Sequence, residues 1–421
     1  MAGSPRPGGR VRSRSRPRSP ARSKRSWPGA DERRVSTGPV FIGAEIYRAS
    51  SFGAHHPLAV PRVSTVMDLA RALGWLAPGQ YRTSPRARPE GLGIWHDPDY
   101  VAALMRAEQA QAVEVWTRER YRIGTSDNPI FPEMFRRPAT GCGAAMLAAG
   151  LLRRGGVVHA PGCGTHHGLP DRANGFCFLN DLAIAILSLR ALGIRRIAYL
   201  DIDAHHPDGV EHGFGRDPEI LMVSVHQAGR WPRTGLAGDR GAGNVYNLPV
   251  PAGLNDSEFA HIRDALVRPL VAAFRPEAVI LQCGADALAE DPMSRLMLSN
   301  NAHADFLHAV RPLAPRLLLT GGGGYNPWSV ARLWTRLWGE LNGLPMPTRL
   351  PPAARQVLRD LSWTRAGRAR PPAPGWTDTL ADPPRPGPLR REIRELVAMH
   401  RARLPQASPG PNVAGKAPGP G

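Results

Sequence analysis

The chain has 421 residues, of which 42% are hydrophobic, and its formal net charge is +19. An apolar fraction of this size can form a full core, so the composition excludes a wholly disordered protein. The longest apolar stretches, at residues 144–152 and 182–187, are far shorter than the roughly 18 residues that a membrane span needs.

The positive charge is concentrated at the two ends of the chain. Residues 1–40 carry a net charge of +9 and residues 341–421 carry +8, which leaves +2 for the 300 residues between them. Residues 1–36 and 406–421 are of low complexity, so we expect two disordered tails, the first of them basic. A basic tail can bind nucleic acid, but the nearly neutral body favours a solvated extension, and we expect neither nucleic acid nor a membrane as partner.

The cysteines are few and contain no CxxC pair, which argues against a disulfide framework: they are Cys142, Cys163, Cys177 and Cys283. The N-terminus lacks the apolar segment of a signal peptide. We therefore expect reduced thiols in a cytoplasmic protein. The length fits two or three domains of about 150 residues or one large α/β domain, and it leaves the oligomeric state open.

Five short apolar runs, each bounded by glycine, proline or charge, are predicted to be strands buried on both faces: residues 155–162, 196–203, 219–226, 277–286 and 316–324. Helical patterns lie between them. One covers residues 181–192, with Asn180 as its cap and Gly193 as its stop.

A second helix is predicted from Pro327 to about residue 341. Its large apolar residues recur at three- and four-residue steps, which indicates a core-facing stripe: Val330, Trp334, Trp338 and Leu341. The alternation of strands and helices predicts a single, doubly wound, mostly parallel sheet with helices on both faces.

Polar residues follow four of the predicted strands, and parallel sheets bind ligands beyond the carboxyl ends of their strands. In chain order they are His166, His167, Asp201, Asp203, His205, Asp208, Asp286 and Tyr325. We expect these side chains to meet in one crevice.

Two carboxylates and one imidazole in this set, those of Asp203, His205 and Asp286, make three ligands with an open fourth position, the pattern of a catalytic zinc site. Asp201 and Asp208 can orient the adjacent histidines. The glycines at 321–324 allow close backbone approach before Tyr325, whose phenol can donate to a developing oxyanion. Alone, the glycine run would also fit a flexible turn or a weak phosphate site.

Long motifs in the sequence resemble the histone deacetylase superfamily, and most closely its bacterial acetoin-utilisation-type branch. They are GCGTHHGLPDRANGFCFLND (162–181), YLDIDAHHPDGVEHGF (199–214), VSVHQAGRWPRTG (223–235), LQCGADALAEDPMSRLMLS (281–299) and GGGGYNPWSVARLWT (321–335). The resemblance extends over about residues 38–400. It implies the arginase–deacetylase fold, with a zinc-dependent deacetylase domain at 38–345 and a C-terminal extension at 346–405 packed on or beside it.

The resemblance also implies roles for the strand-end residues. Asp203, His205 and Asp286 would bind one zinc ion per chain. His167 would be general base and then acid, and His166 would act electrostatically. The remaining assignments are Tyr325, which would polarise the acyl carbonyl, and Asp201 and Asp208, which would support the histidines.

Further residues resemble the family's substrate channel and a second ion site. Gly175, Phe176, Trp231 and Met293 would line an acyl-lysine channel, and Asp127 would bind the substrate backbone at its rim. A potassium ion would lie beside the zinc, held by Asp201, Asp203, His205 and Ser224. The chain departs from the usual motifs at Cys163, Pro207 and Trp231. Pro207 puts in question how Asp208 meets His167, and the other two would narrow the channel.

The implied activity is hydrolysis of N-ε-acetyl-lysine on acetylated protein substrates, with release of acetate. Three alternatives remain. A binuclear manganese ureohydrolase would need carboxylates where Pro207 and Leu288 stand. A silent acetyl-lysine reader would be expected to lack a ligand or Tyr325. A deacetylase of acetylpolyamines or other small amides would use an acidic gate, for which Glu290 and Asp291 lie close in sequence.

Overall fold

The computed structural model describes residues 38–365 and 367–404, and the tails predicted at 1–36 and 406–421 lie outside these ranges. The described residues form an eight-stranded sheet in the order β2-β1-β3-β8-β7-β4-β5-β6, in which all neighbouring strands are parallel. The strands are β1 (Val40–Gly43), β2 (Tyr81–Thr83), β3 (Gly156–Ala160), β4 (Ile197–Asp201), β5 (Ile220–Gln227), β6 (Val245–Val250), β7 (Ala278–Gln282) and β8 (Arg316–Thr320). A small antiparallel hairpin, β9 (Thr364–Arg365) and β10 (Arg368–Ala369), lies outside the sheet.

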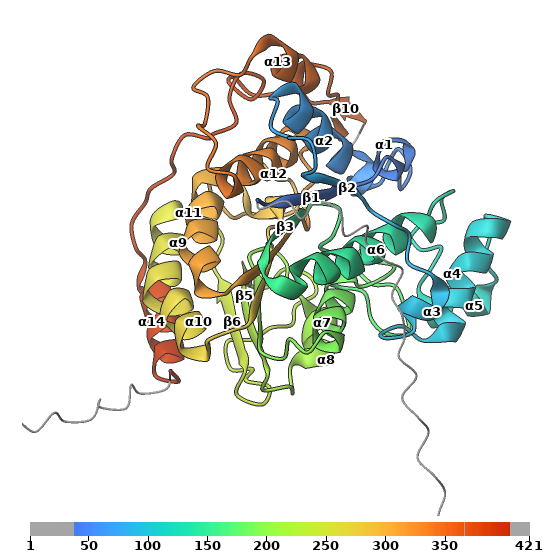
Figure 1. The fold of residues 1–421 in the computed structure, drawn as a ribbon, viewed down its shortest axis with the longest axis horizontal. Helices are drawn as coiled ribbons and strands as arrows, with labels where there is room; N and C mark the ends of the chain where they lie inside the picture. Colours follow the sequence, from blue (N-terminus) through green and yellow to red (C-terminus); the bar gives the residue numbers. More distant parts are fainter. Residues whose placement is uncertain (1–37, 366, 405–421) are drawn as a thin grey trace, which may run out of the picture. The chain divides into compact units, whose positions relative to one another are not determined.

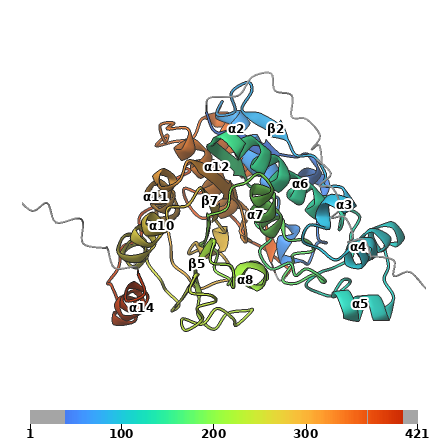
Figure 2. The same ribbon diagram turned by 60° about the horizontal axis from the view of Figure 1, so that its bottom comes forward.

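Helices cover both faces of the sheet (Figures 1 and 2). One core contains apolar residues of α4, α6, α7 and α8, and a second contains residues of α2, α9, α10, α11, α12 and α14. The helices are α1 (Ile46–Ala49), α2 (Val63–Ala72), α3 (Pro89–Leu92), α4 (Pro98–Ala110), α5 (Val115–Tyr121), α6 (Arg136–Leu151), α7 (Asp181–Ala191), α8 (Asp208–Phe214), α9 (Asp256–Ile262), α10 (Arg268–Phe274), α11 (Asn300–Val310), α12 (Pro327–Leu341), α13 (Pro352–Arg359) and α14 (Arg391–Arg401). The predicted fold class is confirmed.

Successive residues of a central strand face opposite cores, as the pleat requires. In β4, Ile197 and Tyr199 belong to the first core, whereas Ala198 and Leu200 belong to the second. All five predicted strands are present as β3, β4, β5, β7 and β8. The other three strands of the sheet escaped the sequence analysis because β1 and β2 are very short and β6 carries Asn247 and Pro249 among its apolar residues.

The two predicted helices are confirmed, the first with its predicted cap and stop and the second with a cap that was not predicted. The Asn180 side chain accepts the Ala183 N–H at 2.9 Å, and α7 ends just before Gly193, whose φ of +86° suits glycine. The Asn326 side chain accepts the N–H of Trp328 at 3.1 Å at the start of α12. The stripe of α12 is core, because its members are at most 2% exposed: Val330, Trp334, Trp338 and Leu341.

The segment after α12 packs on the rest of the described chain. A buried ion pair joins Arg332 Nη1 to Asp382 Oδ1 at 2.6 Å. Near the end of α14, His400 Nε2 donates to the Asn247 carbonyl at 2.8 Å. Arg403 donates to the carbonyl of Val245 at 2.8 Å. The bonds of His400 and Arg403 engage carbonyls of β6, the strand at one edge of the sheet, where another chain could otherwise pair.

Two further features concern the whole described region. Within residues 38–365 and 367–404, no helix combines the length and apolarity needed to cross a membrane. The four cysteines are buried and unpaired.

Candidate active site

The predicted site residues meet at the carboxyl edge of the sheet. Asp201 is the last residue of β4, and Asp203 and His205 follow it. Asp286 lies in a short 3-10 turn after β7, and Tyr325 lies between β8 and α12. His166 and His167 follow β3. In the sheet, β3, β8, β7 and β4 lie side by side in that order, so these residues are at the same edge as the others.

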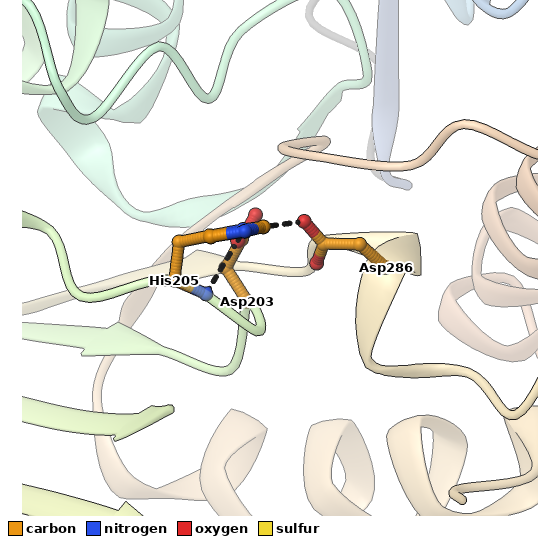
Figure 3. Close-up of side chains that lie close together, drawn as sticks. All are labelled: Asp203, His205 and Asp286. Carbon is orange, nitrogen blue, oxygen red and sulfur yellow. Dashed lines mark hydrogen bonds and ion pairs between the residues drawn. The ribbon is translucent and has the colours of Figure 1, made fainter. Parts of the chain in front are cut away.

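Asp203, His205 and Asp286 form a compact triad (Figure 3), with one possible ligand atom from each lying within 4.8 Å of the others. His205 Nδ1 lies 3.2 Å from Asp203 Oδ1 and 3.0 Å from Asp286 Oδ2. All three residues are at most 8% exposed. This is the one group of three or more possible ligands that the described residues hold.

Main-chain donors fix the two carboxylates of the triad. Asp286 Oδ1 accepts the Ala204 N–H at 2.9 Å, and Asp203 Oδ2 accepts the Gly323 N–H at 2.7 Å. The Gln282 amide also donates to Asp203 Oδ2, at 2.9 Å. Each carboxylate therefore keeps one oxygen directed at His205 while the other is held by the backbone.

The electrostatics of the triad favour a bound cation. Burial, together with the charge of Asp203, raises the pKa of Asp286 to about 6. Burial alone would lower the pKa of His205, but hydrogen bonds to Asp203 and Asp286 raise it to about 10. The two buried carboxylates thus draw positive charge, a proton on His205 or a metal ion, to the position that the three residues share. With one nitrogen and two oxygen ligands, this donor set fits a catalytic zinc ion with an open coordination position.

Each histidine of the adjacent pair has its own carboxylate. His166 Nδ1 lies 2.8 Å from Asp201 Oδ2, and His167 Nδ1 lies 2.6 Å from Asp208 Oδ1. The Tyr199 hydroxyl also donates to Asp201. Pro207 does not prevent the contact between Asp208 and His167, which answers the question that this departure raised.

The environment drives the two histidines in opposite directions. Burial and the charge of His166 lower the pKa of His167 to about 4, although Asp208 acts to raise it. For His166, burial acts to lower the pKa, but Asp201 and Asp203 raise it to about 9. The protonated form is therefore favoured on His166 and disfavoured on His167, so His167 is the member of the pair that is set up to accept a proton.

Tyr325 presents a protonated phenol. Burial, with Asp286 and Asp203 nearby, raises its pKa well above the usual value, so the hydroxyl remains a hydrogen-bond donor. The preceding Gly324 has a φ of +140°, and a Cβ there would lie 2.6 Å from Val330 and 2.9 Å from Ala285. Glycine is therefore required at this position for the chain to reach Tyr325.

Two aromatic residues predicted to line a channel, Trp231 and Phe176, lie close to the histidine pair and to Tyr325. The Trp231 ring meets the His167 ring edge-on, with 4.6 Å between centroids, and Trp231 is 42% exposed. A Cβ on Gly175, whose φ is +51°, would overlap the Trp231 ring. Phe176 lies 6.0 Å from Tyr325 between ring centroids. The structure thus brings Gly175, Phe176 and Trp231 to the residues of the triad and the histidine pair.

The two other predicted channel residues lie on separate loops. Asp127 is exposed, and its carbonyl oxygen accepts from His56 Nε2 at 3.2 Å. His56 in turn contacts Phe176, with 4.5 Å between ring centroids. Met293 is half-buried, and its carbonyl accepts from Arg230. His56 escaped the sequence analysis because no local motif marks it.

A cavity of about 70 Å³ is lined by Asp203 and His205 of the triad and by Tyr325. Two arginines also line it: Arg62, whose Nη1 donates to the Gly322 carbonyl at 2.7 Å, and Arg137, which donates to the Ser50 carbonyl at 2.6 Å. Arg62 Nε is buried and has no hydrogen-bond partner among the residues that the structure describes. The cavity can therefore accommodate a small anion. These arginines come from segments far from the motifs, so no local pattern indicated them.

Comparisons with known proteins agree with this geometry. The pattern of the histone deacetylase domain matches residues 56–341. The chain therefore belongs to the histone deacetylase family, whose members are hydrolases.

Several particular relatives are similar to the chain. It is 33% identical over 327 residues to the acetoin utilization protein AcuC of Bacillus subtilis (strain 168), which covers 74% of this chain and 84% of that protein. It is 35% identical over 312 residues to histone deacetylase 2 of Oryza sativa subsp. japonica, covering 71% of this chain and 60% of that longer protein. The crystal structure of an HDAC homologue from Aquifex aeolicus aligns with a TM-score of 0.82 and 33% identity, covering 86% of this chain and 100% of that one.

Proposed function

We propose that this protein is a zinc-dependent deacetylase that hydrolyses the acetyl amide of N-ε-acetyl-lysine on proteins and releases acetate. The observation that carries the proposal is the aromatic channel, with Trp231 beside His167 and Phe176 beside Tyr325, leading to a triad of metal-ligand type. A lysine stem is apolar along its length and gains by desolvation in such a channel.

Asp203, His205 and Asp286 would hold the zinc ion, which supplies Lewis-acid polarisation of the acyl carbonyl and a more acidic water. His167, neutral and oriented by Asp208, takes a proton from the attacking water and returns it to the departing lysine nitrogen. The charged His166 stabilises the negative charge that develops. The Tyr325 hydroxyl donates a hydrogen bond to the acyl oxygen.

A potassium ion beside the zinc is a further part of the proposal. Asp201 and Ser224 are paired in register on β4 and β5, so their main-chain groups adjoin the triad. Ser224 Oγ lies 2.8 Å from His226 Nδ1. Asp203 and His205 would complete this second site with oxygen atoms of their main chains, the ligand type that a hard monovalent cation accepts.

The acetate product would be released toward the cavity, because acetate is an anion and Arg62 and Arg137 supply positive charge there. The partner that we propose at the other end of the channel is a peptide backbone. The exposed Asp127 carboxylate can accept backbone N–H groups, which a peptide has and a free polyamine lacks.

The polyamine alternative depends on an acidic gate, and the two nearby acids are engaged elsewhere. Glu290 forms an ion pair with Arg385. Asp291 is 5% exposed, and it accepts main-chain N–H groups. Neither presents a free carboxylate to a cationic substrate, which favours the peptide.

The deciding experiment is Asp127→Ala, assayed on an acetyl-lysine peptide and on an acetylpolyamine. The substitution keeps the main-chain carbonyl that His56 binds, so the channel wall is preserved. We expect kcat/KM to fall about tenfold for the peptide, the scale of one lost charge-assisted hydrogen bond, and to stay within twofold for the polyamine. Asp305→Ala, at an exposed carboxylate on α11, is the matched control. Equal losses on both substrates, or a wild-type enzyme that strongly prefers the polyamine, would contradict the peptide assignment.

A further inference from the structure

Asp291 is a buried acid whose two carboxylate oxygens are both engaged by main-chain donors. It lies in the loop between β7 and α11 and is 5% exposed. Its Oδ1 accepts the Met293 N–H at 2.9 Å, and its Oδ2 accepts the Tyr325 N–H at 2.7 Å. One side chain thus joins Met293, a predicted channel residue, to Tyr325, whose hydroxyl would face the acyl group in the proposed function.

A carboxyl group at this depth is costly. Burial, together with the like charge of Asp286, raises the pKa of Asp291 to about 8, whereas hydrogen bonds from Met293 and Tyr325 act in the opposite direction. An apolar residue of similar size would avoid this cost. Both oxygens of the acid are nevertheless used, one by the Met293 N–H and the other by the Tyr325 N–H.

The loop of Asp291 is attached to the Tyr325 segment at a second point. The Asn326 side chain, which caps α12, also donates to the Glu290 carbonyl at 3.3 Å. The Asp291 N–H closes a turn onto the Leu288 carbonyl at 3.0 Å. Two consecutive residues of the loop are therefore bonded to two consecutive residues of the segment that carries the phenol.

The attachment acts on Tyr325, whose phenol must be placed accurately for the proposed reaction. The phenol oxygen must reach the acyl oxygen within hydrogen-bond distance, and sites of this kind tolerate displacements of only about 0.5 Å. Tyr325 follows Gly324, whose φ of +140° lies in the region that glycine favours. Because glycine has no side chain, Gly324 makes no side-chain contact that could fix the main chain before Tyr325. The main chain of Tyr325 must therefore be fixed by a neighbouring element.

We propose that Asp291 is a positioning residue of the deacetylase reaction, which holds the Tyr325 main chain where its hydroxyl reaches the acyl carbonyl and ties that placement to the channel wall at Met293. The proposal rests on the proposed function, because it requires Tyr325 to act on the acyl group. It adds a residue that touches neither metal nor substrate.

The nearly isosteric Asp291→Asn is the informative substitution. A carboxamide has one acceptor oxygen, and its NH₂ group would face the second N–H, so one of the two bonds is lost. If Asp291 acts through the Tyr325 hydroxyl, the substitution matters only where that hydroxyl is present. A double-mutant cycle with Tyr325→Phe measures this dependence directly.

We expect Tyr325→Phe alone to lower kcat by about 10²–10³-fold, the scale of one lost oxyanion donor. Asp291→Asn alone should lower kcat about tenfold with KM within twofold, and it should change kcat less than twofold when Tyr325 is already Phe. Glu290→Gln, one residue away and paired only with Arg385 through its side chain, is the control and should retain wild-type kcat. An equal loss from Asp291→Asn in both backgrounds would overturn the proposal.

Metal content and thermal unfolding are measured for every variant. Should Asp291→Asn not fold, Asp291→Ser keeps one acceptor and leaves room for water, and it enters the same cycle with the same expected pattern. If neither folds, Asp291 determines folding rather than positioning, and the proposal is wrong. A Tyr325→Phe enzyme with wild-type kcat would instead reject the role of Tyr325 in the proposed function, which separates the two failures.

Discussion

The floor of the site and the rim of the channel are built in different ways. On the floor, Asp203, His205 and Asp286 are at most 8% exposed, and main-chain N–H groups hold the carboxylates. On the rim, Trp231 is 42% exposed and Asp127 is held through the contact of its carbonyl with His56. The floor is thus fixed by strand ends, whereas the rim depends on contacts between loops. We infer that the floor determines the reaction and the rim selects the substrate.

The largest effect should come from the floor. Asp286→Asn removes one of two charged ligands and leaves an amide opposite His205, so we expect loss of the metal and a fall in kcat of about 10³-fold or more. Elemental analysis should find one zinc ion per wild-type chain and much less in the variant. Stoichiometric zinc with full activity in Asp286→Asn, or two tightly held transition metals in the wild type, would contradict this prediction.

A smaller effect is expected behind the histidine pair. Asp208→Asn should lower kcat by about 10–100-fold, because an oriented carboxylate strengthens its imidazole as a base. Asp208 acts to raise the pKa of His167, so its removal lowers that pKa. The acid limb of the kcat profile should therefore move to lower pH while the plateau falls. The matched control is Asp171→Asn, at a partly exposed acid paired with Arg120. If the acid limb moved to higher pH instead, the titration that produces it would belong to a group other than His167.

The rim should affect substrate binding more than chemistry. Gly175→Ala places a methyl group into the Trp231 ring at a position with φ of +51°, so the channel wall must shift. We expect KM for an acetyl-lysine peptide to rise about tenfold. The fall in kcat should be smaller than the rise in KM, although the methyl group would also lie 2.9 Å from the His167 ring. Gly238→Ala, at a glycine with open space around its Cβ direction, is the control. If only kcat fell, Gly175 would affect the reaction itself rather than substrate binding, which would contradict this prediction.

The smallest effect on activity should come from a region distant from both floor and rim. Glu258 is fully buried and forms an ion pair with Arg390 at 2.6 Å, which fixes the start of α14. Glu258→Gln should lower Tm by about 2–4 °C and leave kcat unchanged.

The difference in Tm between the wild type and Glu258→Gln should depend on pH, because the ion pair shifts the pKa of Glu258. Burial acts to raise the pKa of Glu258, but Arg390 lowers it below its usual value of 4.5. The ion pair therefore stabilises the protein above that value and less as the pH falls through the folded-state pKa. The difference in Tm between wild type and variant should shrink in acid, as thermal unfolding at several pH values can show. A difference that grows in acid would contradict the assignment.

The sequence predicted the parts of the site that follow strands directly. Buried parallel strands have a clear apolar signature, so β3, β4, β5, β7 and β8 could be recognised, and the polar residues after them had to lie on one edge. Strands of three or four residues, such as β1 and β2, carry too little pattern for this argument.

Contacts between distant segments could not be predicted from local pattern. Arg62 and Gly322 are 260 positions apart in the chain, and Asp291 and Tyr325 are 34 apart. Glu290 and Asp291 lie near the predicted channel residues in sequence, which suggested an acidic gate. Their contacts with Arg385 and with main-chain N–H groups could not be predicted from the sequence. These contacts depend on how loops pack after the sheet has formed.

Two of the buried cysteines have a consequence for the redox behaviour of the protein. Cys163 and Cys177 line the same cavity as the metal-type triad, and burial raises the pKa of both thiols. They therefore remain neutral, and a neutral thiol is both a poor metal ligand and a poor nucleophile toward peroxide. A peroxide that entered the cavity would therefore meet thiols and not thiolates. We expect the two cysteines to resist oxidation although they line the same cavity as the triad.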